Sequence, residues 1–137
     1  MASGHSDLKR KSSSQYLLQC RNATILFVGV SQFEINFGSD EFTIALHFNP
    51  RFNADGDHNT VVCNSFQDFK WGEEVKVGSF PFRQGQEFTV IIDFTPTKFV
   101  ITLSDGSTIN FPNRIGAKEY SVINVRGKVS LISLQIK

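Results

Sequence analysis

The sequence predicts an all-β domain, and three features of its 137 residues lead to that fold class. The aromatic residues are 14 Phe, two Tyr and one Trp, and aromatic side chains favour strands over helices. Gly, Asn, Asp and Ser recur at short intervals, as they do in the turns that join strands. No apolar stripe with the 3.6-residue period of a helix reaches helical length.

In the first half of the chain, apolar and β-branched residues occur in runs of strand length. The runs 24–30 (TILFVGV) and 32–37 (QFEINF) precede a turn at residues 38–40. The longest run, 42–52, alternates apolar and polar residues, and 59–66 (NTVVCNSF) follows it across a loop rich in Gly and Asp. Alternation with period 2 is typical of strands that bury one face.

The second half of the chain continues this pattern. Its expected strands are 73–80, 87–94, 98–103, 107–111, 120–125 and 128–136. Residues 104–106 (SDG) predict a hairpin, because an Asp-Gly pair accepts the positive φ angles of a tight turn. Short strands at this spacing indicate a sandwich or barrel of antiparallel sheets.

The chain is expected to form one domain behind a short arm. Residues 1–14 are polar and Ser-rich and predict a flexible arm, and residues 15–137 form the domain. The formal net charge is +1, and the basic cluster 9–11 (KRK) is short, so nucleic acid is not an expected partner. No apolar run approaches the roughly 18 residues that cross a bilayer, so membrane insertion is not expected either.

The N-terminus and the cysteines indicate the cellular compartment in which the chain is made. The basic residues of the arm are not followed by an apolar segment, so a secretory signal is not expected. Cys20 and Cys63 are therefore expected to be free thiols made in a reducing compartment.

A row of polar residues stands out in the run 42–52. Successive side chains of a strand point to opposite faces of the sheet. The residues expected on the core face are Phe42, Ile44, Leu46, Phe48, Pro50 and Phe52. Those expected on the outer face are Thr43, Ala45, His47, Asn49, Arg51 and Asn53. Pro50 lacks an N–H donor, so the strand is expected to be an edge, to bulge or to end near it.

The outer face of this run is a candidate binding surface. Antiparallel pairing with residues 59–66 would add Asn64 to the polar row, and Trp71 and Glu74 follow. Planar polar groups can bind adjacent hydroxyls of a sugar, and a flat aromatic ring packs against the apolar face of a pyranose. A solvated sheet face also shows polar residues at alternate positions, so the pattern alone leaves both interpretations open.

Several stretches of the sequence resemble the galectin (S-type lectin) signature in order and near the family's spacing. They are "HFNPR" at 47–51, "VVCNS" at 61–65 and "WGEE" at 71–74. Two further stretches, "FPFRQGQEFTVIIDF" (80–94) and "FPNRIG" (111–116), are similar to later strands of that family.

The resemblance covers about residues 24–137 and implies both a fold and a function. The implied fold is a jelly-roll β-sandwich of two antiparallel sheets that binds β-galactosides on its concave face, without a metal or another cofactor. The implied protein cross-links the glycans of glycoproteins and glycolipids as a homodimer. It is also expected in the cytoplasm and outside the cell, which it reaches without a signal peptide.

The resemblance assigns sugar contacts to His47, Asn49, Arg51, Asn64, Trp71 and Glu74. The first three match positions that contact the axial 4-hydroxyl and the ring oxygen of galactose. Asn64 and Glu74 match positions on its 6- and 4-hydroxyl side, and Trp71 matches the stacking platform. Glu74 is also expected to pair with Arg51 and to fix its guanidinium.

Three departures from the family pattern affect the outer part of the site and the N-terminus. Lys76 stands where the family usually has Arg, and it supplies a charge without the planar fork that holds a second sugar. Asp55 stands where many members have another residue, often His. Residues 15–32 fit the pattern poorly, so the N-terminal strand is expected to be displaced or exchanged in a dimer.

Other functions compete with the lectin interpretation. Cys63 and His47 could form a nucleophile and base, and Asp55, Asp57 and Glu74 could supply a glycosidase carboxylate pair. The strand parity puts Cys63 and His47 on opposite faces, so no enzymatic activity is expected. The main alternative is a structural or interaction protein on the same fold that has lost or altered its sugar specificity, for example toward mannose.

Overall fold

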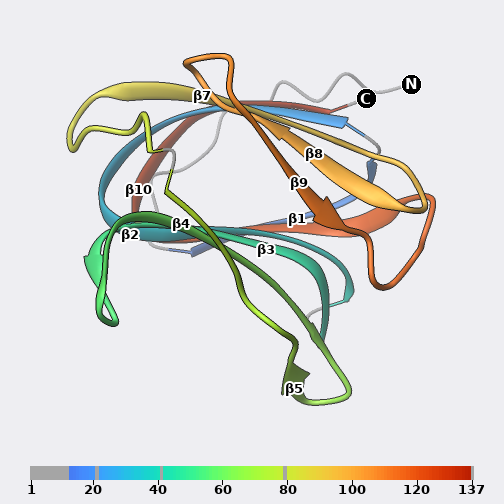
Figure 1. Cartoon of the computed structure of the whole chain (residues 1–137). Coiled ribbons are helices and arrows are strands. Elements are labelled where there is room, and N and C mark those ends of the chain that lie inside the picture. Colours follow the sequence, from blue (N-terminus) through green and yellow to red (C-terminus); the bar gives the residue numbers. More distant parts are fainter. Residues whose placement is uncertain (1–12, 21, 41, 79, 137) are drawn as a thin grey trace.

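Strands form all the regular structure of the described residues, which are 13–20, 22–40, 42–78 and 80–136 of a computed structural model (Figure 1). The strands are β1 (Ser13–Cys20), β2 (Asn22–Asp40), β3 (Thr43–Ala54), β4 (Asp57–Gln67), β5 (Lys70–Trp71), β6 (Val75–Val77), β7 (Glu87–Phe94), β8 (Lys98–Thr102), β9 (Thr108–Pro112) and β10 (Tyr120–Ile136). The predicted all-β class is confirmed. Within these ranges, no helix has the length and hydropathy needed to span a membrane.

Two long strands, β2 and β10, contribute to both layers of the sandwich (Figure 1). The N-terminal half of β2 pairs with β7 and with the C-terminal half of β10. Its C-terminal half pairs with β3 and with the N-terminal half of β10. One layer therefore has the order β9-β8-β7-β2-β10, and the other has β1-β10-β2-β3-β4, with β5 and β6 paired to β4.

Glycines permit the bend at which β2 and β10 change layer. Gly127 has a φ of 100°, and a Cβ atom there would lie 2.8 Å from the carbonyl oxygen of Gln32 and from Cα of Phe33. A Cβ atom on Gly29 would lie 2.8 Å from the ring of Phe33. Because both positions lack a side chain, Phe33 can turn into the core, where its ring centroid lies 4.9 Å from that of Phe27.

The continuity of these strands corrects the predicted elements. The predicted runs 24–30 and 32–37 both belong to β2, and 120–125 and 128–136 both belong to β10. The polar and Gly-containing segments between them bend the strands, but the two strands remain paired on either side of the bend.

The strand at Ser13–Cys20 was not among the runs predicted from the sequence. β1 begins at Ser13, inside the stretch assigned to the arm, and pairs with β10 of the same chain. Residues 1–12 of the expected arm lie outside the described part of the chain. The N-terminal strand exchange expected for a dimer is not tested by a single chain.

Phenylalanine rings fill the space between the layers. The largest fully buried side chains include Tyr120, Phe27, Phe33, Phe37, Phe48, Phe99 and Phe111. Cys63 is a free thiol in this core, as the strand parity predicted, and burial raises its pKa to about 12. The side chain of Cys20 is not among those described.

A β-bulge changes the predicted faces at the start of β3. His47 pairs with Asn64 and Ile44 pairs with Phe66, so β3 has one extra residue between these two pairs. Ala45 is consequently buried in the core and not on the outer face. Ile44 lines a pocket on the outer face, and the prediction that placed it in the core is wrong.

Beyond the bulge, the alternation follows the prediction. Leu46, Phe48 and Phe52 are buried in the core. Phe42 precedes the strand and is 58% exposed, so its predicted core position is also wrong. The pairing of β3 with β2 ends at Phe48, so Pro50 pairs with β4 alone, consistent with the local edge that its missing donor predicted.

Candidate functional site

A groove with a volume of about 390 Å³ lies on the outer face of β3 and β4. Its lining residues are Gln32, Glu34, His47, Asn49, Arg51, Asp55, Asn64, Trp71, Gly72 and Glu74. All the predicted site residues except Lys76 are among them, and Lys76 contacts a residue next to the groove. Gln32 and Glu34 come from β2 and were not predicted.

The polar row of β3 is held in place by hydrogen bonds within the protein. The His47 Nδ1 atom lies 2.7 Å from Oδ1 of Asn36. The Asn49 side-chain amide donates to the carbonyl oxygen of Phe33 at 2.7 Å. Arg51 Nε donates to Oδ1 of Asn49 at 2.8 Å. Each side chain is thus fixed by a neighbour before any ligand arrives, which lowers the entropic cost of binding.

The carboxylate that holds Arg51 is Asp57. Arg51 Nη1 lies 2.7 Å from Oδ2 of Asp57, and Lys76 Nζ lies 2.9 Å from the other oxygen. The hydrogen bond from Lys76, together with that from Arg51, lowers the pKa of Asp57. The expected Arg51–Glu74 pair is present at 3.8 Å and is therefore the looser contact. Lys76 acts here as a second cation on Asp57.

Strand parity could not identify Asp57 as a site residue. Counted back from Asn64 along β4, it falls on the opposite face. Asn59 has a φ of 46°, and a left-handed residue interrupts the regular alternation of a strand. Asp55, at the start of the turn, lies 3.9 Å from Arg51 Nη2 with a largely exposed carboxylate at the rim of the groove.

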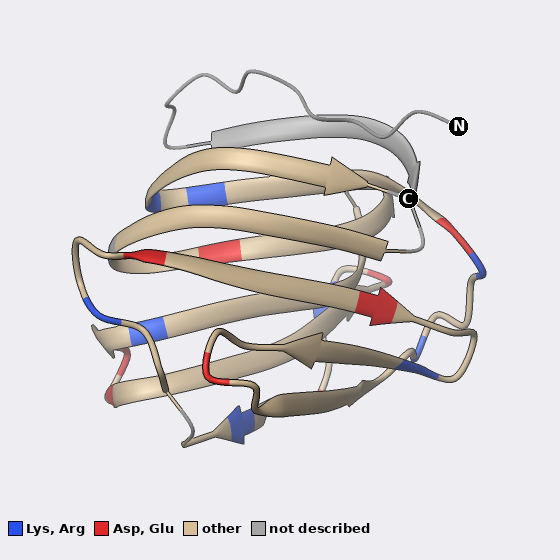
Figure 2. Cartoon of the chain, turned by 90° about the horizontal axis from the view of Figure 1, so that it is seen from above, with Lys and Arg blue, Asp and Glu red and all other residues tan. Residues whose placement is uncertain are grey.

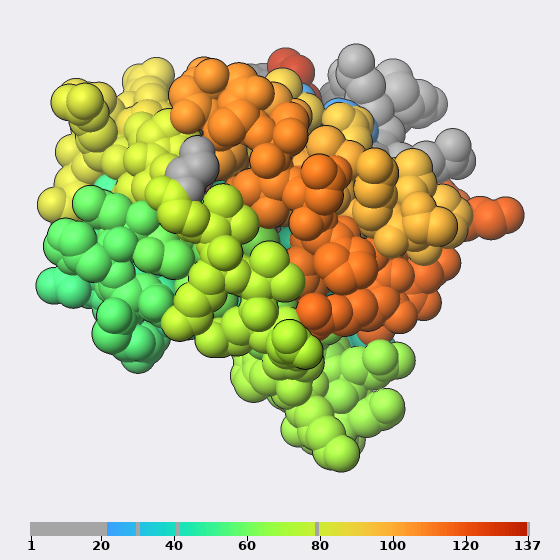
Figure 3. Space-filling model, viewed as in Figure 1, coloured from blue at the N-terminus to red at the C-terminus, as the bar shows by residue number. Residues whose placement is uncertain are grey.

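Trp71 presents an exposed ring at the side of the groove. Its ring is 4.7 Å from that of His47 and 5.1 Å from that of Phe66, between centroids. The residue is 51% exposed, and it belongs to β5, in the hairpin that projects from the body of the molecule (Figures 1 and 3). A fixed and exposed indole beside polar groups suits stacking on the apolar face of a sugar.

Arg114 supports the far wall of the groove from below and was also missed. Its guanidinium donates to Asn64 Oδ1 at 3.2 Å and to the carbonyl oxygen of Glu73 at 2.9 Å. The Asn64 amide in turn donates to the carbonyl oxygen of Gly72 at 3.0 Å. A Cβ atom on Gly72 would lie 2.6 Å from Nη1 of Arg114, so a larger residue there would displace this guanidinium. The motif "FPNRIG" contains Arg114, but nothing local to it indicates this contact.

The hydrogen bonds around Asn36 assign the tautomer of His47. The Asn36 amide nitrogen faces Glu34 Oε1 at 3.0 Å and Asn124 Oδ1 at 3.5 Å, so its oxygen faces His47. The Nδ1 atom of His47 therefore carries the proton, and Nε2 is a hydrogen-bond acceptor. Burial lowers the pKa of His47, which is thus neutral at pH 7.

Within the described ranges, no group of three His, Cys, Asp or Glu side chains is placed to hold a metal ion. The groove presents planar polar groups, carboxylates and an exposed aromatic ring.

The chain is similar to known proteins in both sequence and structure. Residues 19–136 match the family model described as galactoside-binding lectin. The chain is 43% identical over 107 residues to a beta-galactoside-binding lectin of Electrophorus electricus, with 78% of each chain covered. It is also similar to the crystal structure of Dario rerio galectin-1-L2, with a TM-score of 0.83, 42% identity, and 89% of this chain and 94% of that chain covered. CG-16, a homodimeric agglutinin from chicken liver, has a TM-score of 0.83 and 31% identity, with 91% and 99% covered.

Proposed function

Since this chain belongs to the galectin family of galactoside-binding lectins, we propose that it binds β-galactosides in the groove on β3 and β4. The observation that carries the proposal is a preformed row of planar polar groups beside an exposed indole ring. His47 is fixed by Asn36, Asn49 by the backbone of Phe33, and Arg51 by Asn49 and Asp57, and Trp71 lies against His47.

Each group has a role that follows from its chemistry. Neutral His47 accepts a hydrogen bond from a sugar hydroxyl at Nε2, and Arg51 donates through Nη2 to a neighbouring oxygen. Glu74 accepts from a hydroxyl on the side of Asn64. Trp71 packs against the C–H face of the pyranose and removes apolar surface from water. A sugar that places two adjacent hydroxyls and an apolar face in this arrangement satisfies all of them together.

Isothermal titration with lactose tests this proposal, with mannose as the comparison sugar. We expect saturable binding of lactose and no measurable binding of mannose. Mannose binding without lactose binding would favour an altered specificity on the same fold. The absence of measurable binding for both sugars would favour a structural protein that does not bind them.

We expect lactose binding to weaken in acid because His47 loses its acceptor when it is protonated. The pKa of this imidazole lies below its ordinary value of 6.5, so binding should be constant near pH 7 and fall only as the pH drops below about 6.5. The loss should be about tenfold, as expected for one hydrogen bond to a neutral acceptor that becomes a donor. Titrations from about pH 8 to about pH 5 measure it. His58, which is exposed and outside the groove, offers a control.

The His58→Gln variant should show the same pH profile as the unmodified protein. A profile that is flat down to about pH 5, or whose midpoint lies above pH 6.5, would exclude the assigned role of His47.

We also propose that the chain forms a homodimer that cross-links glycans. Its structural neighbour CG-16 is a homodimeric agglutinin. Two strand edges support a two-fold interface: among the described strands, β1 ends one layer and the C-terminal half of β10 ends the other. Sedimentation velocity should give a dimer, and the protein should agglutinate cells in a lactose-inhibited manner. A monomer at micromolar concentration would contradict the proposal.

We propose that binding is not accompanied by hydrolysis. Cys63 lies in the core while His47 lines the groove, so the two do not form a nucleophile and base. The similar proteins are named as lectins. Release of a chromophore from a chromogenic galactoside would refute this proposal.

We also propose that the protein acts both in the cytoplasm and outside the cell. The buried free thiol of Cys63 suits synthesis in a reducing compartment. Detection of the protein in cell lysate and in washed medium of intact cells would test it, with a cytoplasmic enzyme as the leakage control.

A further inference from the structure

Glu34 lies in the groove although neither the parity of β3 nor the family signature pointed to it. Its side chain is 29% exposed, and Oε1 lies 4.0 Å from Nδ1 of His47. The same oxygen accepts a hydrogen bond from the Asn36 amide at 3.0 Å. This hydrogen bond holds the carboxylate at the wall of the groove, where a ligand in contact with His47 would meet its charge.

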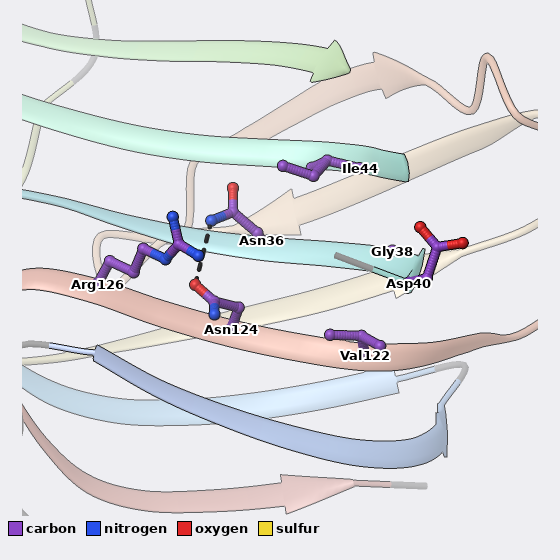
Figure 4. Close-up of a pocket in the computed structure, with 7 residues that line it drawn as sticks. All are labelled: Asn36, Gly38, Asp40, Ile44, Val122, Asn124 and Arg126. Carbon is purple, nitrogen blue, oxygen red and sulfur yellow. Dashed lines mark hydrogen bonds between the residues drawn. The ribbon is translucent and has the colours of Figure 1, made fainter. Parts of the chain in front are cut away.

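The cation next to Glu34 does not neutralise it. Arg126 is the partner of Glu34 across the β10–β2 pairing, and it lines a smaller adjoining pocket with Asn36 and Asn124 (Figure 4). Within the described residues, the ion-pair contact of Glu34 is His47, which is neutral at pH 7. No Lys or Arg of the described residues is within ion-pair distance of the Glu34 carboxylate.

The rest of the groove adds to this charge. Within the described residues, three carboxylates line it, those of Glu34, Asp55 and Glu74, against the single cation Arg51. Arg51 already shares its charge with Asp57, which lies 2.7 Å away.

The nearest lysine does not reverse this balance. Lys76 is held by the same Asp57 carboxylate at 2.9 Å and lies 4.0 Å from Glu74. In Figure 2, the acidic and basic residues of the described part are spread over both layers.

We propose that Glu34 is a specificity-determining residue that restricts the groove to neutral galactosides. This proposal rests on the galactoside site proposed above. A galactoside with a sulfate or carboxylate substituent would bring a second negative charge near Glu34, and Arg51, the cation that lines the groove within the described residues, is already paired with Asp57. Like charges at about 7 Å in the intermediate dielectric of a groove weaken binding by roughly fivefold to tenfold.

Replacement of Glu34 by glutamine isolates this charge. Glutamine keeps an oxygen that accepts the hydrogen bond of Asn36, so the orientation of Asn36 and the tautomer of His47 are preserved. Glu87→Gln is the matched control, because Glu87 is exposed and begins β7 in the opposite layer.

The experiment is titration of the unmodified protein and both variants with lactose, 3′-sulfolactose and 6′-sulfolactose at low ionic strength. We expect the unmodified protein to bind lactose at least about fivefold more tightly than the sulfated sugars. Glu34→Gln should still bind lactose, and the ratio of its lactose and sulfolactose affinities should be severalfold smaller for at least one sulfated isomer. Glu87→Gln should reproduce the unmodified protein. The discrimination should also shrink as salt is raised.

Three results would overturn the proposal. Equal binding of lactose and both sulfated sugars by the unmodified protein would show that the groove does not discriminate by charge. An unchanged ratio in Glu34→Gln would assign the discrimination to other groups. A loss of lactose affinity in that variant would make Glu34 a positioning residue for His47. Failure of lactose to bind the unmodified protein would refute the proposed function. Lactose binding with equal affinity for the sulfated sugars would refute the charge proposal alone.

Discussion

Replacing Arg51 with alanine is expected to lower lactose affinity at least about 100-fold, since charge-assisted hydrogen bonds contribute about 1.5–3 kcal/mol each. Arg51 is the one cation that lines the groove within the described residues, and its side chain is only 12% exposed. The hydrogen bond to Asn49 and the ion pair with Asp57 orient it before the sugar binds. Isothermal titration measures the loss, and thermal unfolding checks that the variant is folded.

Two further variants define the reason for the loss. Arg51→Lys keeps the charge but cannot donate to Asn49, Asp57 and a sugar oxygen from one plane, so it should bind nearly as poorly as alanine. Arg83→Ala removes an exposed arginine from the turn before β7 and should bind normally. Near-normal affinity in Arg51→Lys would show that charge alone suffices, and near-normal affinity in Arg51→Ala would place the sugar elsewhere.

Replacing Gly127 with alanine is expected to destabilise the fold by about 3 kcal/mol, through a left-handed backbone and a steric clash. The φ angle of 100° is unfavourable for any residue with a Cβ atom. That atom would lie 2.8 Å from the backbone of Gln32 and Phe33, which cannot move without disturbing the bend of β2. Chemical denaturation measures the change in the free energy of unfolding.

Gly106→Ala is the matched control for the clash. Gly106 has a φ of 85°, but no atom lies within 4 Å of its hypothetical Cβ atom. It should therefore cost only about 1–2 kcal/mol, the backbone term alone. Equal losses in both variants would show that the close approach at Gly127 relaxes at no cost.

The parts of the site that lie on one strand and its hairpin partner could be predicted from the sequence. The row His47, Asn49 and Arg51 has period 2, and the short loop between β3 and β4 sets the pairing of His47 with Asn64. The same argument placed Cys63 in the core. In these cases a local pattern determines the face that a side chain occupies.

Local patterns could not predict features that depend on other strands. The bulge at Ala45 arises from the pairing of β3 with its neighbours, and alanine is small enough to suit either face. Arg114 reaches Asn64 from 50 residues away in the sequence. For Glu34 and Asn36 a signal was present, because polar residues alternate with buried ones in the run QFEINF, but nothing in that run identifies β3 as its neighbour.

The passage of β2 and β10 through both layers joins the face that carries the groove to the opposite face as one cooperative unit. Neither layer can open fully without breaking a strand that the other layer needs, so partial unfolding of the groove alone is disfavoured. A bound sugar therefore stabilises the whole domain by mass action, and slows amide hydrogen exchange in β7, β8 and β9 although it contacts none of them. Occupancy of the groove by a sugar should therefore be measurable as slower amide hydrogen exchange on the opposite face of the molecule.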